Sequence, residues 1–293
     1  MQNLYSPKVV KEFLSRYNIL LKKKFGQNFL VDKNTLEKIA HIAELDNSTS
    51  VLEIGPGIGT LTVELSKRAK NVLTIEIDIS LKPVLDEILA DSLNVKTIYG
   101  DFLNQDLNLI SKTYFDDKPF TVVANVPYYI TSQIIMSILE SKLEVNKLVL
   151  LVQKEVAQRI VAKPGTKDFG AISNAVQYRM IPRIAAIVPR TVFMPMPDVD
   201  SAILVLDKRN EPAVTVEDSN LMFAVIKASF AQRRKKLINS LTILFPKDKP
   251  KDEVLEILNG SGVDLNRRGE TLSLEEFAKI ADTISKSSVI IAS

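Results

Sequence analysis

The sequence predicts an α/β protein whose larger part is a doubly wound, mostly parallel sheet and whose C-terminal part is a small all-α domain. Between residues 48 and about 206, apolar strand-like runs alternate with amphipathic helical stretches, as in chains that build parallel sheets with helical crossovers. Beyond residue 211 we expect only helices. At 293 residues, 46% of them hydrophobic and 25% charged, the chain has the length and composition of a folded protein with both parts.

Seven apolar runs are the candidate strands. They are Ser50–Ile54, Val72–Ile77, Val95–Tyr99, Phe120–Ala124, Lys147–Val152, Ile184–Val188 and Ala202–Leu206. Helices between them are expected at Thr60–Ala69, Leu81–Ala90, Ser132–Glu140 and Lys154–Ala162. Because no long helix separates the last two strands, they could form an antiparallel pair at the sheet edge.

Changes in composition predict three regions. Residues 1–47 are expected to form a basic arm and a helix that pack on the sheet domain. Residues 48–210 form that domain, and the polar segment 207–212 ends its strand pattern. Residues 211–293 form the helical domain, with helices expected at Asn220–Leu244, Lys251–Leu258 and Leu274–Ser285.

The residue types exclude several classes of site. The chain has no cysteine and one histidine, which excludes disulfides, thiolate zinc sites and a cysteine nucleophile. The histidine, His41, lies in a helical pattern and is interpreted as a helix-surface or half-buried residue and not as a catalytic one. We also expect no metal site. No apolar segment approaches the roughly 20 residues of a membrane span, and residues 1–7 lack the apolar core of a secretory signal. We therefore expect a cytoplasmic protein that does not bind membranes.

Positive charge is concentrated in two places, although the net charge is only +3. Residues 1–40 hold eight Lys or Arg against three acidic residues, and Arg233–Lys236 form a second cluster. Two separate basic patches on a near-neutral body suggest a polyanionic partner that is bound at specific places. Solvated helix faces are the alternative explanation.

A glycine-rich turn and two acidic residues follow the first three strands. The turn is Gly55-Pro56-Gly57-Ile58-Gly59, the second strand reaches Glu76, and Asp101 follows the third. Glycines let the backbone approach a ligand closely, and an acidic residue about 20 positions later is where a ribose diol is bound. The three strand ends therefore predict an adenosine-bearing ligand that lies across the sheet.

The glycine spacing distinguishes two kinds of cofactor. A dinucleotide fingerprint reads GxGxxG, whereas this turn resembles the first motif of S-adenosylmethionine-dependent methyltransferases. A nicotinamide-dependent dehydrogenase is the alternative, but no candidate acid or base for hydride transfer follows. The resemblance implies S-adenosyl-L-methionine as the cofactor.

The corner Asn125-Val126-Pro127-Tyr128 follows the fourth strand and resembles the catalytic motif of methyltransferases that act on exocyclic amino groups. An adenine N6 lone pair is delocalised into the ring, so its nucleophilicity must be raised. The Asn125 side-chain oxygen and the Pro127 carbonyl are expected to accept one N6 hydrogen bond each, and Tyr128 to stack on the base. A rigid turn capped by aromatic rings is the purely structural alternative. Tyr129 is expected to pack behind the motif and support Tyr128.

Five further segments make the resemblance closer. They are Lys22–Leu30 (KKKFGQNFL), Val152–Ala157 (VQKEVA), Phe193–Ser201 (FMPMPDVDS), Phe230–Lys235 (FAQRRK) and Arg267–Ser273 (RRGETLS). Together they resemble the bacterial small-subunit ribosomal RNA adenine dimethyltransferases, the enzymes of kasugamycin sensitivity, from about residue 8 to about residue 280. Two departures are Val126, where leucine is commoner, and Asp198, where the family often has lysine.

This resemblance implies both a fold and a reaction. Residues 48–210 would be a Rossmann-like class I methyltransferase domain, and residues 211–293 a helical domain that binds RNA or the subunit. The reaction would be N6,N6-dimethylation of two adjacent adenosines in the 3′-terminal hairpin loop of 16S rRNA, within the 30S subunit, with a role in subunit biogenesis. The partner would then be 16S rRNA, and we expect a monomer.

The resemblance also implies roles for individual residues. Cofactor contacts are expected at Asn28, Leu30, Gly55, Gly57, Glu76, Asp101 and Asn125. The catalytic set is Asn125, Pro127, Tyr128 and Phe193, with Phe193 as the second face of an aromatic sandwich around the target base or, alternatively, as ordinary core. Phosphate contacts that position RNA without reading bases are expected from Lys22, Lys23, Lys24, Arg233, Arg234 and Lys235.

Two other functions remain open at this point. An erythromycin-resistance enzyme would modify an adenine in large-subunit RNA with the same motif, although Arg267–Ser273 and the proline-rich loop from Phe193 favour the small-subunit enzyme. A ribosome-assembly factor would bind immature subunits through the basic patches without catalysis. The intact corner at Asn125–Tyr128 argues against a purely structural role.

Overall fold

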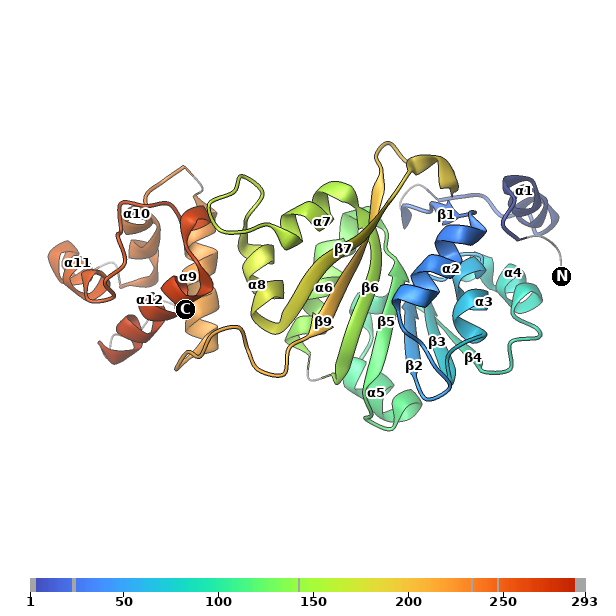
Figure 1. Ribbon diagram of the computed structural model, residues 1–293, viewed down its shortest axis with the longest axis horizontal. Helices are drawn as coiled ribbons and strands as arrows, with labels where there is room; N and C mark the ends of the chain where they lie inside the picture. Colours follow the sequence, from blue (N-terminus) through green and yellow to red (C-terminus); the bar gives the residue numbers. More distant parts are fainter. Residues whose placement is uncertain (1–3, 23–24, 142, 233, 247, 288–293) are drawn as a thin grey trace. The chain divides into compact units, whose positions relative to one another are not determined.

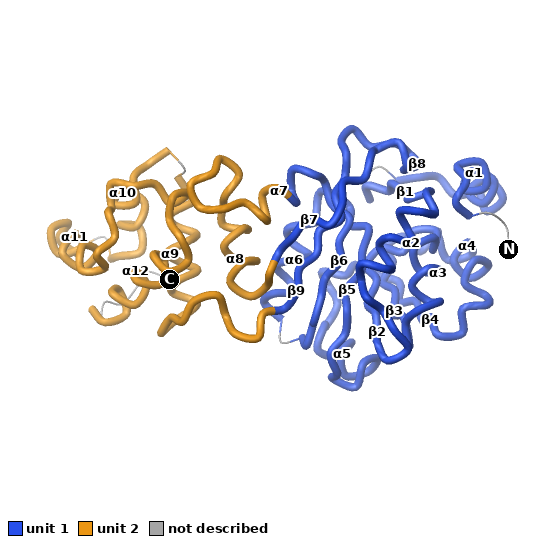
Figure 2. Tube along the Cα trace, viewed as in Figure 1, with its two compact units in different colours: residues 1–157, 182–208 blue, residues 158–181, 209–293 orange. Residues whose placement is uncertain are grey.

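The computed structural model describes residues 4–22, 25–141, 143–232, 234–246 and 248–287 (Figure 1). The chain divides into two compact units (Figure 2). Unit 1 comprises residues 1–157 and 182–208, and unit 2 comprises residues 158–181 and 209–293. Within the described ranges, a helix with the length and apolar character needed to span a bilayer does not occur.

A seven-stranded sheet forms the centre of unit 1, in the order β4-β3-β2-β5-β6-β9-β7. Its strands are β2 (Ser50–Ile54), β3 (Asn71–Glu76), β4 (Val95–Tyr99), β5 (Phe120–Asn125), β6 (Val145–Gln153), β7 (Met180–Val188) and β9 (Ser201–Lys208). The first five of these pair in parallel, whereas β9 runs antiparallel to β6. Each strand corresponds to one of the seven expected runs, and the predicted α/β class is confirmed.

The strand order places the ligand site of such a sheet. The chain winds outward from β2 to β3 and β4 in one direction and from β5 to β6 in the other. In open α/β sheets, ligands bind beyond the carboxyl ends of the strands at the point where this direction reverses. That point lies between β2 and β5, directly beside the glycine turn and the Asn125 corner.

Helices cover the sheet because its central strands are apolar on both faces. The helices of unit 1 are α1 (Pro7–Arg16), α2 (Lys33–Ile42), α3 (Thr60–Ser66), α4 (Lys82–Ile88), α5 (Leu107–Phe115), α6 (Thr131–Glu140) and the start of α7 (Lys154–Val161). Helices α2 and α3 share a buried core with β2, β5, β6 and β9. In Figure 1, α6 lies behind the strands that α2 and α3 face. His41 lies on the exposed side of α2.

A small two-stranded ladder brings two distant segments together beside the sheet. Strand β1 (Phe29–Leu30) pairs antiparallel with β8 (Phe193–Met194), with Leu30 opposite Phe193. Val31 extends the contact by donating its N–H to the carbonyl of Val192 at 2.9 Å. The ladder fixes the chain before α2 against the loop that leads into β9.

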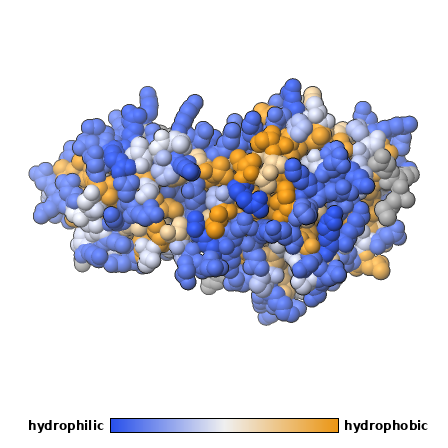
Figure 3. Space-filling view, in the orientation of Figure 1, coloured by the Kyte–Doolittle hydropathy of each residue, from blue (hydrophilic) through white to orange (hydrophobic). Residues whose placement is uncertain are grey.

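The edge strand β7 carries part of the apolar surface of unit 1. Figure 3 shows hydrophobic surface gathered over the region of β7 and β9, and Ile187 of β7 is 48% exposed. Pro182 lies in the same strand, and a proline is tolerated there because an edge strand does not need every N–H for pairing.

Unit 2 is built from helices around one core. They are α8 (Ala171–Arg179), α9 (Ser219–Ala231), α10 (Leu237–Leu241), α11 (Lys251–Asn259) and α12 (Leu274–Lys286). Met222, Leu237, Leu272 and Phe277 are fully buried in that core. A small all-α C-terminal domain was expected, and the helical character of this region is confirmed.

Two expectations about unit 2 need correction. The predicted single helix Asn220–Leu244 is broken after Ala231, because Leu237 begins a new helix whose N–H donates to the carbonyl of Arg267 at 2.8 Å. The expected boundary near residue 210 also misses residues 158–181, which group with the helices. Tyr178 of α8 explains the grouping, since it packs edge-on against Phe223 with ring centroids 5.3 Å apart.

Candidate active site

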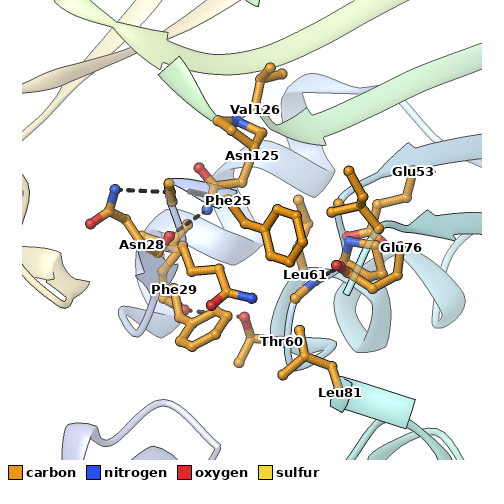
Figure 4. A pocket seen from close by; sticks show the side chains of 18 of the residues that line it. Phe25, Asn28, Phe29, Glu53, Thr60, Leu61, Glu76, Leu81, Asn125 and Val126 are labelled. Atoms are coloured by element: carbon orange, nitrogen blue, oxygen red, sulfur yellow. Dashed lines mark hydrogen bonds between the residues drawn. The ribbon is translucent and has the colours of Figure 1, made fainter. Parts of the chain in front are cut away.

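A pocket opens at the carboxyl ends of β2, β3 and β5 (Figure 4). Its walls are the segment 25–30, called the arm here, the glycine turn after β2, the end of β3, and the corner after β5. Eight of the predicted site residues line it: Asn28, Leu30, Gly55, Gly57, Glu76, Asn125, Pro127 and Tyr128. The fold thus brings together residues that are up to 100 positions apart in the chain.

The glycine turn has a backbone that other residues would not adopt readily. Gly55, Gly57 and Gly59 have φ angles of 70°, 59° and 86°, in the left-handed region that favours glycine. A Cβ on Gly57 would lie 2.9 Å from the ring of Phe29 in the arm. A Cβ on Gly55 would meet no atom closer than 4.0 Å, so the backbone is open to a ligand at that point.

Two buried glutamates line the pocket. Glu76 accepts N–H donors from Gly57 at 3.0 Å and from Asp78 at 2.7 Å, and burial raises its pKa to about 7. Glu53 is 1% exposed, and burial raises its pKa to about 8. Its Oε2 has no hydrogen-bond partner within the part of the chain that the structure describes. Such a set suits a ligand that carries hydroxyl groups and positive charge.

Asp101 lies at the end of the neighbouring strand but does not belong to the described lining of the pocket. Gly100, just before it, donates its N–H to the carbonyl of Glu76 at 2.8 Å, which joins the ends of β3 and β4. One carboxylate oxygen of Asp101 caps the short helix Phe102–Asn104 through Leu103 at 3.0 Å. Its other oxygen has only a 3.5 Å contact to Asn104 and can accept a further donor.

The side chain of Asn125 is oriented by the arm. Its Nδ2 donates to the main-chain carbonyl of Asn28 at 2.9 Å (Figure 4). Because an amide has one donor end and one acceptor end, this bond turns Oδ1 away from the arm carbonyl. The acceptor atom is therefore presented in one orientation before any substrate binds.

The two carbonyls of the corner differ in how they are used. The Pro127 oxygen accepts from the N–H of Ile130 at 3.2 Å and from the Thr131 hydroxyl at 3.4 Å, which closes the 3₁₀ helix η4 (Tyr128–Ile130). The Val126 oxygen accepts no hydrogen bond from the described residues. A carbonyl oxygen has two lone pairs, and both lone pairs of the Pro127 oxygen are already used. The geometry therefore favours the Val126 carbonyl, and not the expected Pro127 carbonyl, as a second acceptor for a ligand.

Tyr128 is half-buried and is held at its hydroxyl end. The Tyr128 Oη lies 2.8 Å from the Oγ of Ser201, a fully buried residue at the start of β9. Burial and the nearby carboxylate of Asp200 raise the pKa of Tyr128. Sequence reasoning missed this role of Ser201, although it is the last residue of the quoted segment from Phe193.

Tyr129 differs from the expectation that it packs behind the motif. It is 58% exposed, and its ring lies beside the arm, where a Cβ on Gly26 would be 3.4 Å from it. The Cβ of Pro127 is at a similar distance, 3.5 Å, from the same point. The residue therefore lies on the outer side of the corner, against the arm.

Phe193 has the surroundings of a core residue. It is 4% exposed, and it packs with Leu30, Leu36, Ile203 and other residues of the core under α2. Within the described lining of the pocket its ring does not occur, although its neighbour across the ladder, Leu30, does. Its role as a stacking face stays a prediction.

Known proteins resemble this chain over nearly its whole length. The family described as "Ribosomal RNA adenine dimethylase" matches residues 18–282. The chain belongs to the ribosomal RNA adenine dimethylase family. That assignment confirms the family expected from the sequence motifs, and the dehydrogenase alternative is excluded.

Individual relatives match this chain over nearly their whole length. The ribosomal RNA small subunit methyltransferase A of Listeria monocytogenes is 46% identical over 284 residues, which is 96% of each chain. The protein of the same name from Geobacillus thermodenitrificans is 46% identical over 97% of each chain.

Solved structures share the fold. A dimethyladenosine transferase from Plasmodium falciparum is 25% identical with a TM-score of 0.75, and the match covers 88% of this chain and 98% of that one. The 23S rRNA methyltransferase ErmE is 29% identical with a TM-score of 0.64, covering 88% and 99%. Both support the Rossmann-like methyltransferase fold of unit 1.

The residues that were expected to contact phosphates fall into three groups. Lys23, Lys24 and Arg233 lie outside the described residues. Lys22 pairs with the buried carboxylate of Asp78 at 2.6 Å and is 40% exposed. Arg234 and Lys235 are exposed in the turn between α9 and α10, where an RNA backbone could reach them.

The segment Arg267–Ser273 has a packing role in unit 2. Arg267 pairs with Glu276 of α12 and donates to the carbonyl of Thr271. A Cβ on Gly269 would lie 2.8 Å from Ser229 of α9, so only glycine fits there. Among the described residues, no group of three acidic or histidine side chains is placed to hold a metal ion.

Proposed function

We propose that this protein transfers methyl groups from S-adenosyl-L-methionine to N6 of two adjacent adenosines in the 3′-terminal hairpin loop of 16S rRNA, within the 30S subunit. The observation that carries the chemistry is the Asn125 amide, which the arm orients at the mouth of the pocket. The names of the bacterial relatives support the small subunit as the substrate. In this proposal the protein acts as a cytoplasmic monomer.

The polar groups and the open backbone of the pocket suit S-adenosyl-L-methionine. The open side of Gly55 leaves room for close approach, and Glu76 can accept ribose hydroxyls. The unpartnered Oε2 of Glu53 suits a cationic group or an N–H donor. The cofactor, when bound, supplies a methyl group on a positively charged sulfur. The residues that would hold it are Asn28, Leu30, Gly55, Gly57, Glu76, Asp101 and Asn125.

Two acceptors would prepare the adenine for methylation. In the first transfer Asn125 Oδ1 and the Val126 carbonyl each accept one N–H of the amino group, and in the second transfer one of them accepts the remaining N–H. These bonds favour a pyramidal nitrogen with a more available lone pair. As the nitrogen gains a methyl group it releases one proton, which passes to solvent. A strong base is not needed, because the nitrogen carries a positive charge once it is methylated and then loses its proton readily to water.

Aromatic rings would hold the base that has left its stack. The Tyr128 ring, fixed by Ser201, offers one face for stacking. We assign the opposite face to Phe193, whose ring would have to become accessible from its buried position next to Leu30. Arg234 and Lys235 would contact phosphates and position the RNA.

A methylation assay on two substrates tests the proposal. Radiolabelled S-adenosyl-L-methionine is supplied with purified 30S subunits or with 23S RNA, and mass spectrometry locates the modified nucleotides. We expect label in two adjacent adenosines of 16S rRNA. The alternative function, methylation of large-subunit RNA, predicts label only in 23S RNA, and that result would replace the proposal.

The variant Asn125→Ala separates catalysis from an assembly role. Removing the oriented acceptor should lower the methylation rate by at least about 100-fold, as for other groups that contact the reacting atoms. Binding to 30S subunits should stay within about twofold, because phosphate contacts dominate affinity. A variant that methylates at the wild-type rate would show that the corner is not the catalytic site.

A further inference from the structure

A buried carboxylate ties the arm to the end of β3. Asp78 is 1% exposed and lies two residues after Glu76. Its Oδ1 accepts from the Lys22 ammonium at 2.6 Å, and its Oδ2 accepts from the Gln27 amide at 2.9 Å. Burial alone would raise the pKa of Asp78, but the hydrogen bonds from Lys22, Ser80 and Gln27 hold it below its usual value.

Gln27 links this carboxylate to the backbone of the chain before the arm. Its Oε1 accepts the N–H of Lys22 at 2.9 Å, while its Nε2 donates to Asp78. Both ends of the amide are thus matched to a partner of the opposite kind. Replacing Gln27 by Glu alone would leave two acceptors facing each other, and replacing Asp78 by Asn alone would place an additional donor group beside Lys22 and Gln27.

The residue after Gln27 carries the contact that orients the catalytic amide. The carbonyl of Asn28 accepts from Asn125 at 2.9 Å. On its other side, Phe29 is fixed by its pairing with Met194. Asn28 therefore lies between two anchors, one at Gln27 and one at Phe29.

The same residues also reach the cofactor pocket. Gln27, Asn28 and Phe29 all line it, and the main-chain N–H of Asp78 donates to Glu76 at 2.7 Å. A substitution at Asp78 should therefore alter two sides of the pocket, the arm and the side chain of Glu76 at the end of β3.

We propose that Asp78 is a positioning residue for methyl transfer: through Gln27 and Lys22 it holds the arm where the Asn28 carbonyl orients the Asn125 amide. Lys22 thereby serves the arm and not, as expected from its charge, an RNA phosphate. This inference rests on the proposed function for its rate measurement, while its binding measurement needs no RNA.

An exchange of donor and acceptor tests the proposal. Asp78→Asn and Gln27→Glu should each lower the methylation rate of 30S subunits, at saturating cofactor, by about tenfold, because each leaves mismatched polar groups in a buried place. S-adenosylhomocysteine should also bind about tenfold more weakly to each in titration calorimetry. The double variant Asp78→Asn/Gln27→Glu restores a matched pair with the roles reversed, and both measurements should recover to within about threefold of wild type.

Three results would overturn the proposal. The first is a single variant with the wild-type rate and affinity. The second is a double variant whose methylation rate and S-adenosylhomocysteine affinity are no higher than those of the worse single variant. Asp78 would then act only through Ser80 or through folding. The third is an equal loss in Glu87→Gln, a control that breaks the 2.9 Å pair between Arg16 of α1 and Glu87 of α4 without touching the arm. If 30S subunits are not methylated even by the wild type, the proposed function fails, but calorimetry still tests the arm.

Discussion

The ring of Tyr128 is held by a hydrogen bond from outside its own motif. Ser201 belongs to β9, and its Oγ lies 2.8 Å from the Tyr128 hydroxyl. The bond connects the corner after β5 to a strand that lies two places away in the sheet. The position of the stacking ring therefore depends on a residue 73 positions later in the chain.

We expect Ser201→Ala to lower the efficiency of RNA methylation without changing cofactor affinity. Loss of one such hydrogen bond is worth about 1 kcal/mol, so kcat/KM for 30S subunits should fall about fivefold while S-adenosylhomocysteine affinity stays the same. Tyr128→Phe removes the other half of the bond and should have a similar effect. Steady-state kinetics of both variants and of their combination provide the measurement. If the losses in the combined variant simply add, the two residues do not act through this bond.

Glu53 should make the stability of the ligand-free protein depend on pH. Burial raises its pKa from 4.5 to about 8, so the folded protein holds a proton that the unfolded chain releases over this range. Its contribution to the free energy of unfolding is fully present below pH 4.5 and is lost as the pH rises to about 8. The loss is on the order of a few kcal/mol. Glu76 has a raised pKa of about 7 and contributes with the same sign.

The variant Glu53→Gln isolates this contribution. The free energy of unfolding, measured with urea between about pH 5 and about pH 8, should decline less steeply with pH in the variant than in the wild type. The decline that remains in the variant is due to Glu76. At high pH the variant should be the more stable protein, because it has no charge to bury. An unchanged slope would mean that Glu53 is already ionised in the folded state.

At the scale of elements, the glycine turn lies in tight contact with the arm. The φ angle of Gly57 is 59°, and Phe29 leaves no room for a Cβ. Because Phe29 is also paired with β8, its ring cannot move without disturbing the arm.

Gly57→Ala should therefore affect ligand binding beyond its effect on stability. An alanine at positive φ is strained by about 1 kcal/mol. In addition, its Cβ would clash with the ring of Phe29 and push the arm away from the glycine turn. We expect S-adenosylhomocysteine affinity to fall about tenfold or more in titration calorimetry. Gly165→Ala is the matched control, because its φ is 83° and a Cβ there would meet no atom within 4 Å. Equal behaviour of the two variants would exclude the clash as the cause.

Strands were easier to predict than helices for a physical reason. A buried strand of a parallel sheet is a continuous apolar run with polar ends, as in β5 (Phe120–Asn125) and β6 (Val145–Gln153), and this signal is local. The break between α9 and α10 has no local signal, since it depends on the hydrogen bond between Leu237 and Arg267. Helix α5 (Leu107–Phe115) and helix α8 (Ala171–Arg179) lie in stretches where no helix was expected.

At the scale of the whole molecule, the chain has one unit with the pocket and another with an exposed basic turn. Arg234 and Lys235 lie in that turn, in unit 2, whereas every residue that lines the pocket belongs to unit 1. Chemistry and RNA affinity should therefore be separable by mutation.

The double variant Arg234→Ala/Lys235→Ala should bind 30S subunits more weakly and with a smaller dependence on salt. Each phosphate contact that is lost should reduce the slope of log K against log salt concentration by roughly 0.7 to 0.9. Cofactor affinity should not change. The control Lys279→Ala/Lys286→Ala removes the same charge from α12 of the same unit. If both double variants have the same effect, net charge is responsible and the turn is not a specific contact.

The sequence by itself determined the fold class, the family, and eight of the residues that line the pocket. These follow from signals within short segments: apolar runs, a glycine turn, an acidic residue at a strand end, and the Asn125–Tyr128 corner. The tertiary structure decided how those residues are held. It showed that Asn28 orients Asn125, that Ser201 fixes Tyr128, and that Lys22 pairs with Asp78. Each of these contacts joins segments more than 50 positions apart, and only folding brings such atoms within hydrogen-bond distance.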